Sequence, residues 1–211
     1  MLLLALWLWG REVTAVRLSV SAPVSGDVAA VGRPQHMRLP TAVRPLGDAL
    51  PQRLDIPELG VQAPVVARGL DPTGTIDPPP FDRPGVVGWY ADGVRPGTAG
   101  AALMVGHADT ETRPAVFHRL GALKPGAMVR VLRDDGTVAE FTVEDVHVVD
   151  RDREDVHVVD RDRFDARQAY GAHRAGRAEL RLITCGSPFD RATHSCTAHV
   201  IVSAYLTGTG L

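Results

Sequence analysis

Short runs of alternating apolar and polar residues, separated by glycine and proline, are the feature that most constrains how this chain can fold. Its 211 residues include 21 Gly and 16 Pro, which divide the sequence into many such runs. This pattern is typical of all-β barrels and sandwiches rather than helical domains. The clearest case lies between Val129 and Val143, where two alternating runs flank the dipeptide Asp135–Gly136. Asp-Gly favours a tight turn between antiparallel strands, so we expect a β-hairpin there.

The composition limits the class of protein. Hydrophobic residues make up 45% of the chain, enough for the core of one compact domain with a tail. The net charge is −2, from 23 Lys and Arg against 25 Asp and Glu, and offers no basis for nucleic-acid binding. The two cysteines cannot form a disulfide framework, and their spacing is unlike that of a zinc site. We therefore expect no metal, no cofactor and no nucleic-acid partner.

Two apolar runs end at residues that can carry chemistry. Leu180–Thr184 is followed by Cys185, and Ala101–Val105 is followed one residue later by His107. Apolar runs of this length are typical of buried strands, so both side chains should emerge where a strand leaves the core. A thiol and an imidazole on neighbouring strand ends can act as nucleophile and base. Taken alone, however, a buried Cys is usually an inert small hydrophobe.

Several further segments surround these two residues. They are Ile56–Val61, Ala63–Val65, Val87–Tyr90, Pro96–Gly97, Gly106–Thr110, Ala115–Phe117, Leu120–Gly126 and Leu180–Gly186. From about Leu54 to Leu206, nearly three quarters of the chain, this pattern resembles the sortases, most closely the class F enzymes of actinobacteria. The resemblance implies an all-β fold, a closed sortase-type β-barrel of about eight strands with short helical or 3-10 turns and an active site at one end.

The resemblance also implies a cysteine transpeptidase. Cys185 would attack a peptide carbonyl and form a thioester, while His107 would first stabilise the thiolate and then protonate the leaving amine. The implied substrates are surface proteins with a C-terminal sorting signal of the Leu-Pro-x-Thr-Gly (LPXTG) kind, and the implied acceptor is an amine of the peptidoglycan precursor of the cell wall. Two alternatives stay open: a degenerate sortase barrel that binds without turnover, and a cysteine peptide hydrolase.

The third catalytic position departs from the family pattern. Sortases carry an Arg on the strand after the Cys, preceded by an aromatic residue, whereas this chain has Thr197 preceded by Cys196. Arg191 could reach the site from the loop, His199 or Thr197 could supply a weaker donor, or the enzyme is impaired. Losing one oxyanion donor typically lowers the rate about 100- to 1000-fold. Cys196 is either a free thiol or, if the geometry allows, a disulfide partner that would mask Cys185.

The N-terminal region is expected to lie outside the barrel. Residues 1–12 begin with an apolar stretch that ends at Trp9, well short of the roughly 20 residues of a membrane-spanning helix. Because sortases of this kind carry an N-terminal anchor, we interpret it as a possible remnant of one, with a short frayed or interfacial tail as the alternative. Residues 13–51 would then be a flexible linker rich in Pro, Gly and Ala, followed by the barrel domain over 52–211. This arrangement predicts a location on the extracytoplasmic face of the cell membrane, attached through the N-terminus.

A tandem duplication spans residues 144–163. Glu144–Arg153 is followed directly by the identical ten residues Glu154–Arg163. Because ten is an even number, either copy could occupy the same strand without exchanging its two faces. We expect one copy to pair in the barrel and the other to form a charged surface excursion, since loop closure depends only weakly on length. The alternative is that the insertion strains the barrel and lowers its stability.

Overall fold

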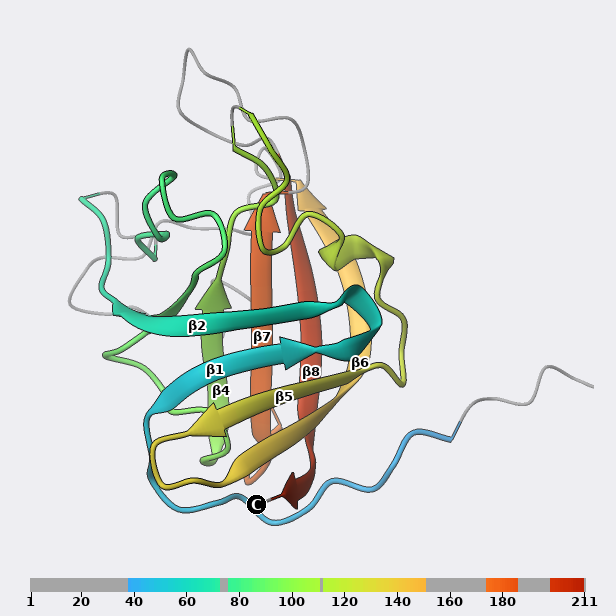
Figure 1. Cartoon of the computed structure of the whole chain (residues 1–211). Helices are drawn as coiled ribbons and strands as arrows, with labels where there is room; N and C mark the ends of the chain where they lie inside the picture. Colours follow the sequence, from blue (N-terminus) through green and yellow to red (C-terminus); the bar gives the residue numbers. More distant parts are fainter. Residues whose placement is uncertain (1–37, 73–75, 111, 151–173, 186–197, 211) are drawn as a thin grey trace, which may run out of the picture. The chain divides into compact units, whose positions relative to one another are not determined.

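The computed structural model describes residues 38–72, 76–110, 112–150, 174–185 and 198–210, which form a closed barrel of eight strands (Figure 1). Around the barrel the strand order is β1-β2-β3-β4-β7-β8-β6-β5. The strands are β1 (Pro51–Ile56), β2 (Val61–Arg68), β3 (Val87–Tyr90), β4 (Gly100–Val105), β5 (Met128–Arg133), β6 (Val138–Asp150), β7 (Ala178–Cys185) and β8 (Ala198–Gly210). In the described ranges the helical elements are two 3-10 turns, η1 (Pro57–Leu59) and η2 (Leu120–Ala122). The expected closed barrel is confirmed.

The hairpin of β5 and β6 forms where the sequence predicts it, with Val131 paired to Ala139. Gly136 has a φ of +81°, a left-handed conformation that glycine adopts without strain. The Asp135 carboxylate accepts hydrogen bonds from the Thr137 backbone N–H at 3.0 Å and from its hydroxyl at 2.7 Å. The turn chemistry therefore sets the register of the two strands.

Alternation along each strand separates the barrel core from the outer face of the sheet. On β7, Leu180 and Leu182 are fully buried in the core. Glu179 and Arg181 alternate with them and so lie on the opposite face. They are buried as well, and Arg181 Nη2 donates to Glu179 Oε2 at 2.8 Å. The same alternation decides which residues share a face at the ends of the strands.

Strands β4 and β7 are parallel neighbours, and this pairing positions the site. The register runs from Gly100 opposite Ala178 to Val105 opposite Ile183. Parallel strands reach the same edge of a sheet at their carboxyl ends, and both ends lie at one end of the barrel, uppermost in Figure 1. The carboxyl-terminal residues of β4 and β7 therefore lie at the same end of the barrel.

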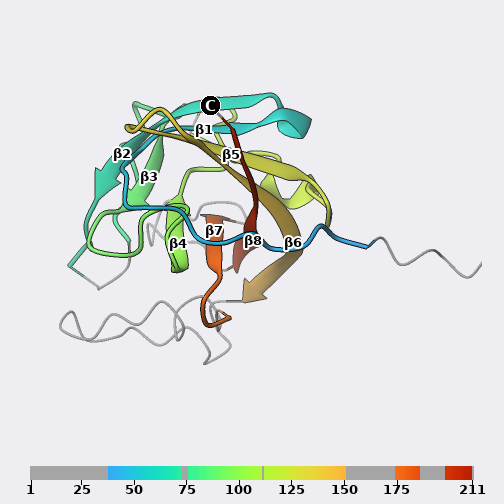
Figure 2. The ribbon, with the colours of Figure 1, turned by 90° about the horizontal axis from the view of Figure 1, so that it is seen from below.

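Residues 40–50 cross the opposite end of the barrel, as the view from below in Figure 2 shows. The Val43 N–H donates to the Leu206 carbonyl at 3.1 Å, and the Leu46 N–H donates to the Gly97 carbonyl at 2.7 Å. The Tyr205 hydroxyl donates to the Pro40 carbonyl at 2.6 Å. The last part of the expected linker 13–51 is thus bonded to the barrel, while residues 13–37 lie outside the described residues and their linker role stays a prediction.

The first copy of the duplicated segment extends β6 beyond the core. From Asp145, opposite Ser203, to Asp150, opposite Ala198, it pairs with β8. The second copy, Glu154–Arg163, lies outside the described residues, so its surface excursion stays a prediction. No helix among the described residues has both the length and the apolar character needed to cross a membrane.

Candidate active site

The ends of β4 and β7 bring His107 and Cys185 to neighbouring positions. The last pair of the ladder is Val105 opposite Ile183, and the Gly106 N–H donates to the Ile183 carbonyl at 3.1 Å. Cys185 is the last residue of β7, two positions beyond Ile183, and His107 is two positions beyond Val105. Adjacent strands lie about 4.8 Å apart. The two residues, 78 apart in sequence (185 − 107), therefore lie at the same end of two neighbouring strands.

The backbone around His107 is held by the loop that follows it. The Phe117 N–H donates to the His107 carbonyl at 2.9 Å, and the Ala115 N–H donates to the Ala108 carbonyl at 2.8 Å. A Cβ atom on Gly106 would come within 2.6 Å of the Phe117 ring. Glycine at position 106 is thus required by the close approach of this loop to the end of β4.

The His107 imidazole has two contacts with the loop before β3. Its Nε2 atom lies 2.6 Å from the Pro79 carbonyl oxygen. Its ring stacks on the Phe81 ring, with centroids 4.1 Å apart and planes 22° apart. A carbonyl oxygen can only accept, so Nε2 carries the proton of this bond. In the neutral ring, Nδ1 is consequently the atom free to accept a proton.

The surroundings of His107 favour its neutral form. Burial of the ring lowers the pKa of His107 below the ordinary imidazole value, and the hydrogen bond to Pro79 raises it by less. The net effect is a lowered pKa, which leaves the ring unprotonated near pH 7. An unprotonated imidazole beside a cysteine position can accept the thiol proton, which is the task of a general base.

On its other side, Cys185 is paired with His199. The antiparallel ladder of β7 and β8 places Cys185 directly opposite His199, one step beyond Thr184 opposite Val200. His199 is half-buried. Because Val202 belongs to the core, alternation along β8 puts His199 on the outer face of the sheet. The strand end of β7 therefore lies between two imidazole-bearing positions, of which the sequence singled out His107 as the base and His199 only as one alternative donor.

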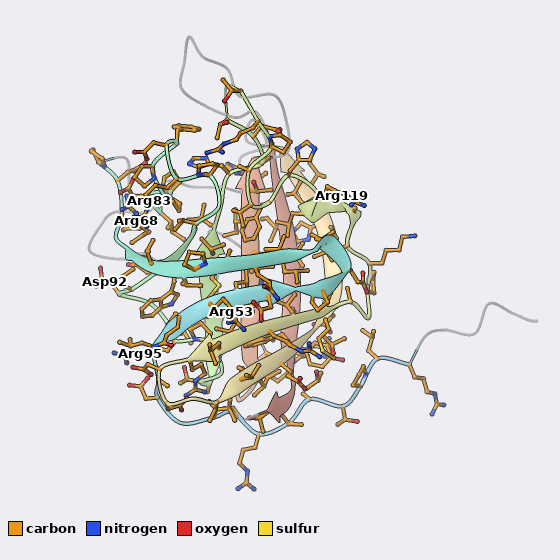
Figure 3. The ribbon with its side chains drawn as sticks, in the orientation of Figure 1. Arg53, Arg68, Arg83, Asp92, Arg95 and Arg119 are labelled. Atoms are coloured by element: carbon orange, nitrogen blue, oxygen red, sulfur yellow. The ribbon has the colours of Figure 1, made fainter. Side chains whose placement is uncertain are left out.

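A groove beside the His107 loop offers room for a ligand. It is an open groove of about 610 Å³, lined by Gly60–Gln62, Arg83–Val86 and Arg113–Val116. The Val116 N–H donates to the Pro84 carbonyl at 2.8 Å, which ties its two loops together. Arg83 is exposed at the same end of the barrel as the ends of β4 and β7 (Figure 3). Volumes of this size are typical of ligand sites.

The remaining residues considered for the site divide into those outside the described residues and those inside them. Arg191, Cys196 and Thr197 lie outside the described residues, so neither the third catalytic position nor a pairing of Cys196 with Cys185 is tested. His118 is at the surface, with its Nδ1 atom 2.7 Å from an Asp109 carboxylate oxygen. Trp89 is buried in the barrel core, whereas Tyr90 is buried in a separate cluster with Ile76 and Leu103.

Sequence reasoning did not find Pro79 and Phe81, which contact His107. The run of prolines at 78–80 before Phe81 was the available signal, because consecutive prolines stiffen a loop. Nothing local to that run, however, indicates that it approaches a histidine 28 residues away.

The family is decided by a comparison with protein-family models, in which the sortase domain matches residues 54–207. The chain belongs to the sortase family. Among solved structures, sortase C-1 from Actinomyces oris is 21% identical to this sortase with a TM-score of 0.51, covering 74% of this chain and 73% of that one. The SrtA sortase from Actinomyces oris is 19% identical with a TM-score of 0.52, covering 84% and 89%. Sortase A from Listeria monocytogenes is 18% identical with a TM-score of 0.50, covering 77% and 90%.

These structural matches show the shared barrel fold, and a search of curated proteins finds no match. Membership of the family supports a sortase-type cysteine transpeptidase.

Proposed function

We propose that this sortase is a class F-like transpeptidase that cleaves an LPXTG-type signal after Thr and transfers the acyl group to an amine of the peptidoglycan precursor. The observation that supports the proposal is the parallel pairing of β4 and β7, because Cys185 ends β7 and His107 follows the end of β4 by two residues. The proposed location is the extracytoplasmic face of the membrane, reached through the N-terminal segment.

The reaction follows from the positions of these two residues. His107 Nδ1 accepts the thiol proton of Cys185, and the sulfur attacks the Thr carbonyl carbon of the signal. The tetrahedral intermediate collapses as the Thr–Gly C–N bond breaks, and His107 returns the proton to the leaving glycine amine. The acceptor amine then attacks the thioester, His107 takes its proton, and the Cys185 thiol is restored as the new amide forms.

The test is to detect the acyl-enzyme and then discharge it. The full chain, under reducing conditions, is incubated with excess Leu-Pro-Ala-Thr-Gly peptide, and intact-mass analysis looks for an adduct, with Cys185→Ala as control. We expect an adduct whose mass equals the peptide cleaved after Thr. Added triglycine should shorten its lifetime and yield a ligated product.

Two outcomes would contradict the proposal, and each would identify a different alternative function. An adduct that water discharges equally well with and without amine would identify a peptide hydrolase. Peptide binding without any adduct, from a folded protein, would identify a non-catalytic barrel. The second alternative is favoured by one specific observation, the Thr at position 197 where sortases carry an Arg.

A further inference from the structure

We propose that the groove beside the His107 loop is the acceptor subsite of this sortase, and that Arg83 and Arg113 make it selective for amines whose chain carries a carboxylate. This inference rests on the proposed function, because it names the class of acceptor for the same reaction. It starts from the groove lining, in which the charged side chains are two arginines, Arg83 on one wall and Arg113 on the other.

The two walls of the groove continue from the segments that hold His107. One wall begins two residues after Phe81, whose ring stacks on the His107 imidazole. On the other wall, the Ala115 N–H donates to the carbonyl of Ala108, the residue after His107, at 2.8 Å. The groove therefore adjoins the segments that contact His107.

An acceptor must approach His107, because this residue takes the proton of the attacking amine. The chain attached to that amine then extends away from the imidazole, and the groove provides a surface on which it can lie. A volume of about 610 Å³ suits a ligand segment of this kind. Because the groove is open, it also suits an acceptor amine that belongs to a larger molecule, such as a cell-wall precursor.

Each of the two arginines is positioned by a short turn. The Arg83 N–H donates to the Pro80 carbonyl at 3.0 Å. Arg113 forms two bonds with Thr110: its N–H donates to the Thr110 hydroxyl at 3.2 Å, and its carbonyl accepts from the Thr110 N–H at 2.9 Å. Together with the backbone hydrogen bond that joins the two walls, these turns fix the backbone at both arginines before a ligand arrives, which lowers the cost of binding.

Both arginines are available to an anion. They are exposed, and among the described residues neither guanidinium has an acidic partner. Of the acidic residues on the same two loops, Asp82 is not part of the groove lining and Asp109 is bonded to His118. A guanidinium presents its N–H donors in a planar arrangement that matches a carboxylate. The groove therefore favours an acceptor with a carboxylate over the same acceptor without one.

The test is a competition between acceptors that differ in charge. The full chain forms the acyl-enzyme from Leu-Pro-Ala-Thr-Gly peptide, and diglycine and diglycine amide are then supplied together at equal concentration. For either acceptor, the amine nitrogen bonds to the Thr carbonyl carbon as the C–S bond breaks, and the amine proton passes through His107 to the sulfur. The ratio of the two products, measured by mass spectrometry, reports the preference whatever the amount of acyl-enzyme. Glycine and triglycine, each with its amide, move the carboxylate about 3.5 Å nearer to or farther from the amine.

We expect the product ratio of wild type to favour the carboxylate about tenfold more than that of Arg83→Gln/Arg113→Gln, for at least one of the three lengths, because two exposed ion pairs are lost. Arg83→Glu/Arg113→Glu should shift the ratio further toward the amide, because the groove then repels a carboxylate. Arg119→Gln is the matched control. Arg119, labelled in Figure 3, is exposed and is not part of the groove lining, so its loss should leave the wild-type ratio.

Two results would overturn the inference while leaving the proposed function in place. One is an unchanged ratio in Arg83→Gln/Arg113→Gln at all three lengths; slower formation of the acyl-enzyme in that variant would then assign the groove to the sorting signal. The other is an equal fall of the ratio in Arg119→Gln, which would assign the preference to the overall charge. A wild-type protein that forms no acyl-enzyme, or one that amines do not discharge, would overturn the proposed function, and this inference with it.

Discussion

The two ends of the barrel differ in how they hold an important side chain. At the end crossed by residues 40–50, Arg133 is 1% exposed and its Nη2 atom donates to the Gly47 carbonyl at 2.6 Å and to Asp135 at 3.2 Å. At the other end, His107 is half-buried and is held by one carbonyl and one stacked ring. The comparison indicates that the first end contributes stability and the second contributes chemistry. Substitutions at the two ends should therefore have separable effects.

The largest expected effect is on turnover, from a substitution at the end of the barrel that carries His107. His107→Ala should lower the acylation rate by about 10²- to 10⁴-fold, because it removes the group that accepts and returns the proton. The free energy of unfolding should change by less than about 1 kcal/mol, since the ring is only half-buried. Acylation kinetics and urea unfolding measure the two quantities. If the slower acylation were explained by a smaller folded fraction, the separate roles of the two ends would be contradicted.

At the opposite end, Arg133→Ala should lower the free energy of unfolding by about 2–4 kcal/mol, because it leaves a cavity and removes bonds to the segment at Gly47. The fraction that stays folded should keep the wild-type acylation rate. Arg133→Met is the matched control: it fills most of the volume without a charge, so it should recover at least half of the loss. A reduced acylation rate in folded Arg133→Met would show that the two ends are coupled.

Gly106→Ala should affect both stability and catalysis, because Gly106 packs against Phe117 and directly precedes His107. The added Cβ atom would come within 2.6 Å of the buried Phe117 ring, so the loop must shift. We expect a loss of about 1–3 kcal/mol in the free energy of unfolding, together with slower acylation because His107 follows directly. The control is Gly47→Ala, where nothing lies within 4 Å of an added Cβ. Wild-type stability in Gly106→Ala would contradict the close packing described here.

The smallest expected effect concerns the pKa of His107. Because burial lowers this pKa, the acid limb of the acylation pH profile should lie below the ordinary imidazole value of about 6.5. Phe81→Ala uncovers the ring to water, so the pKa should rise and the limb should move toward that value. Phe81→Tyr, which keeps a stacked ring, should leave the limb unchanged. An acid limb that does not move in Phe81→Ala would show that burial by Phe81 is not the cause of the lowered pKa of His107.

Much of the fold could be predicted because strands leave a local pattern. The hairpin turn at Asp135–Gly136 and the apolar runs Ala101–Val105 and Leu180–Thr184 are visible as residue types at fixed spacing, and each corresponds to a strand or turn. The local pattern of a run does not determine which strand it pairs with. The parallel pairing of the last two runs could therefore be inferred only through the family resemblance.

The site could be predicted only in part. His107 and Cys185 were found by residue type, whereas the contacts of His107 with Pro79 and Phe81 depend on a loop folding back in three dimensions. His199 was one of several open alternatives, and its position directly opposite Cys185 is known only from the register of β8. Likewise, the proline-rich composition before Pro51 suggested a linker and did not reveal the bonds from Val43 and Leu46 to the barrel.

The central claim is that His107 is the base for Cys185, and the most direct test is the pH dependence of Cys185 alkylation by iodoacetamide. Peptide mapping distinguishes Cys185 from Cys196, and wild type is compared with His107→Gln. We expect wild type to react at least about tenfold faster at pH 7, with the difference vanishing above about pH 9, where a thiol ionises without a base. Superimposable profiles for the two proteins would contradict the account.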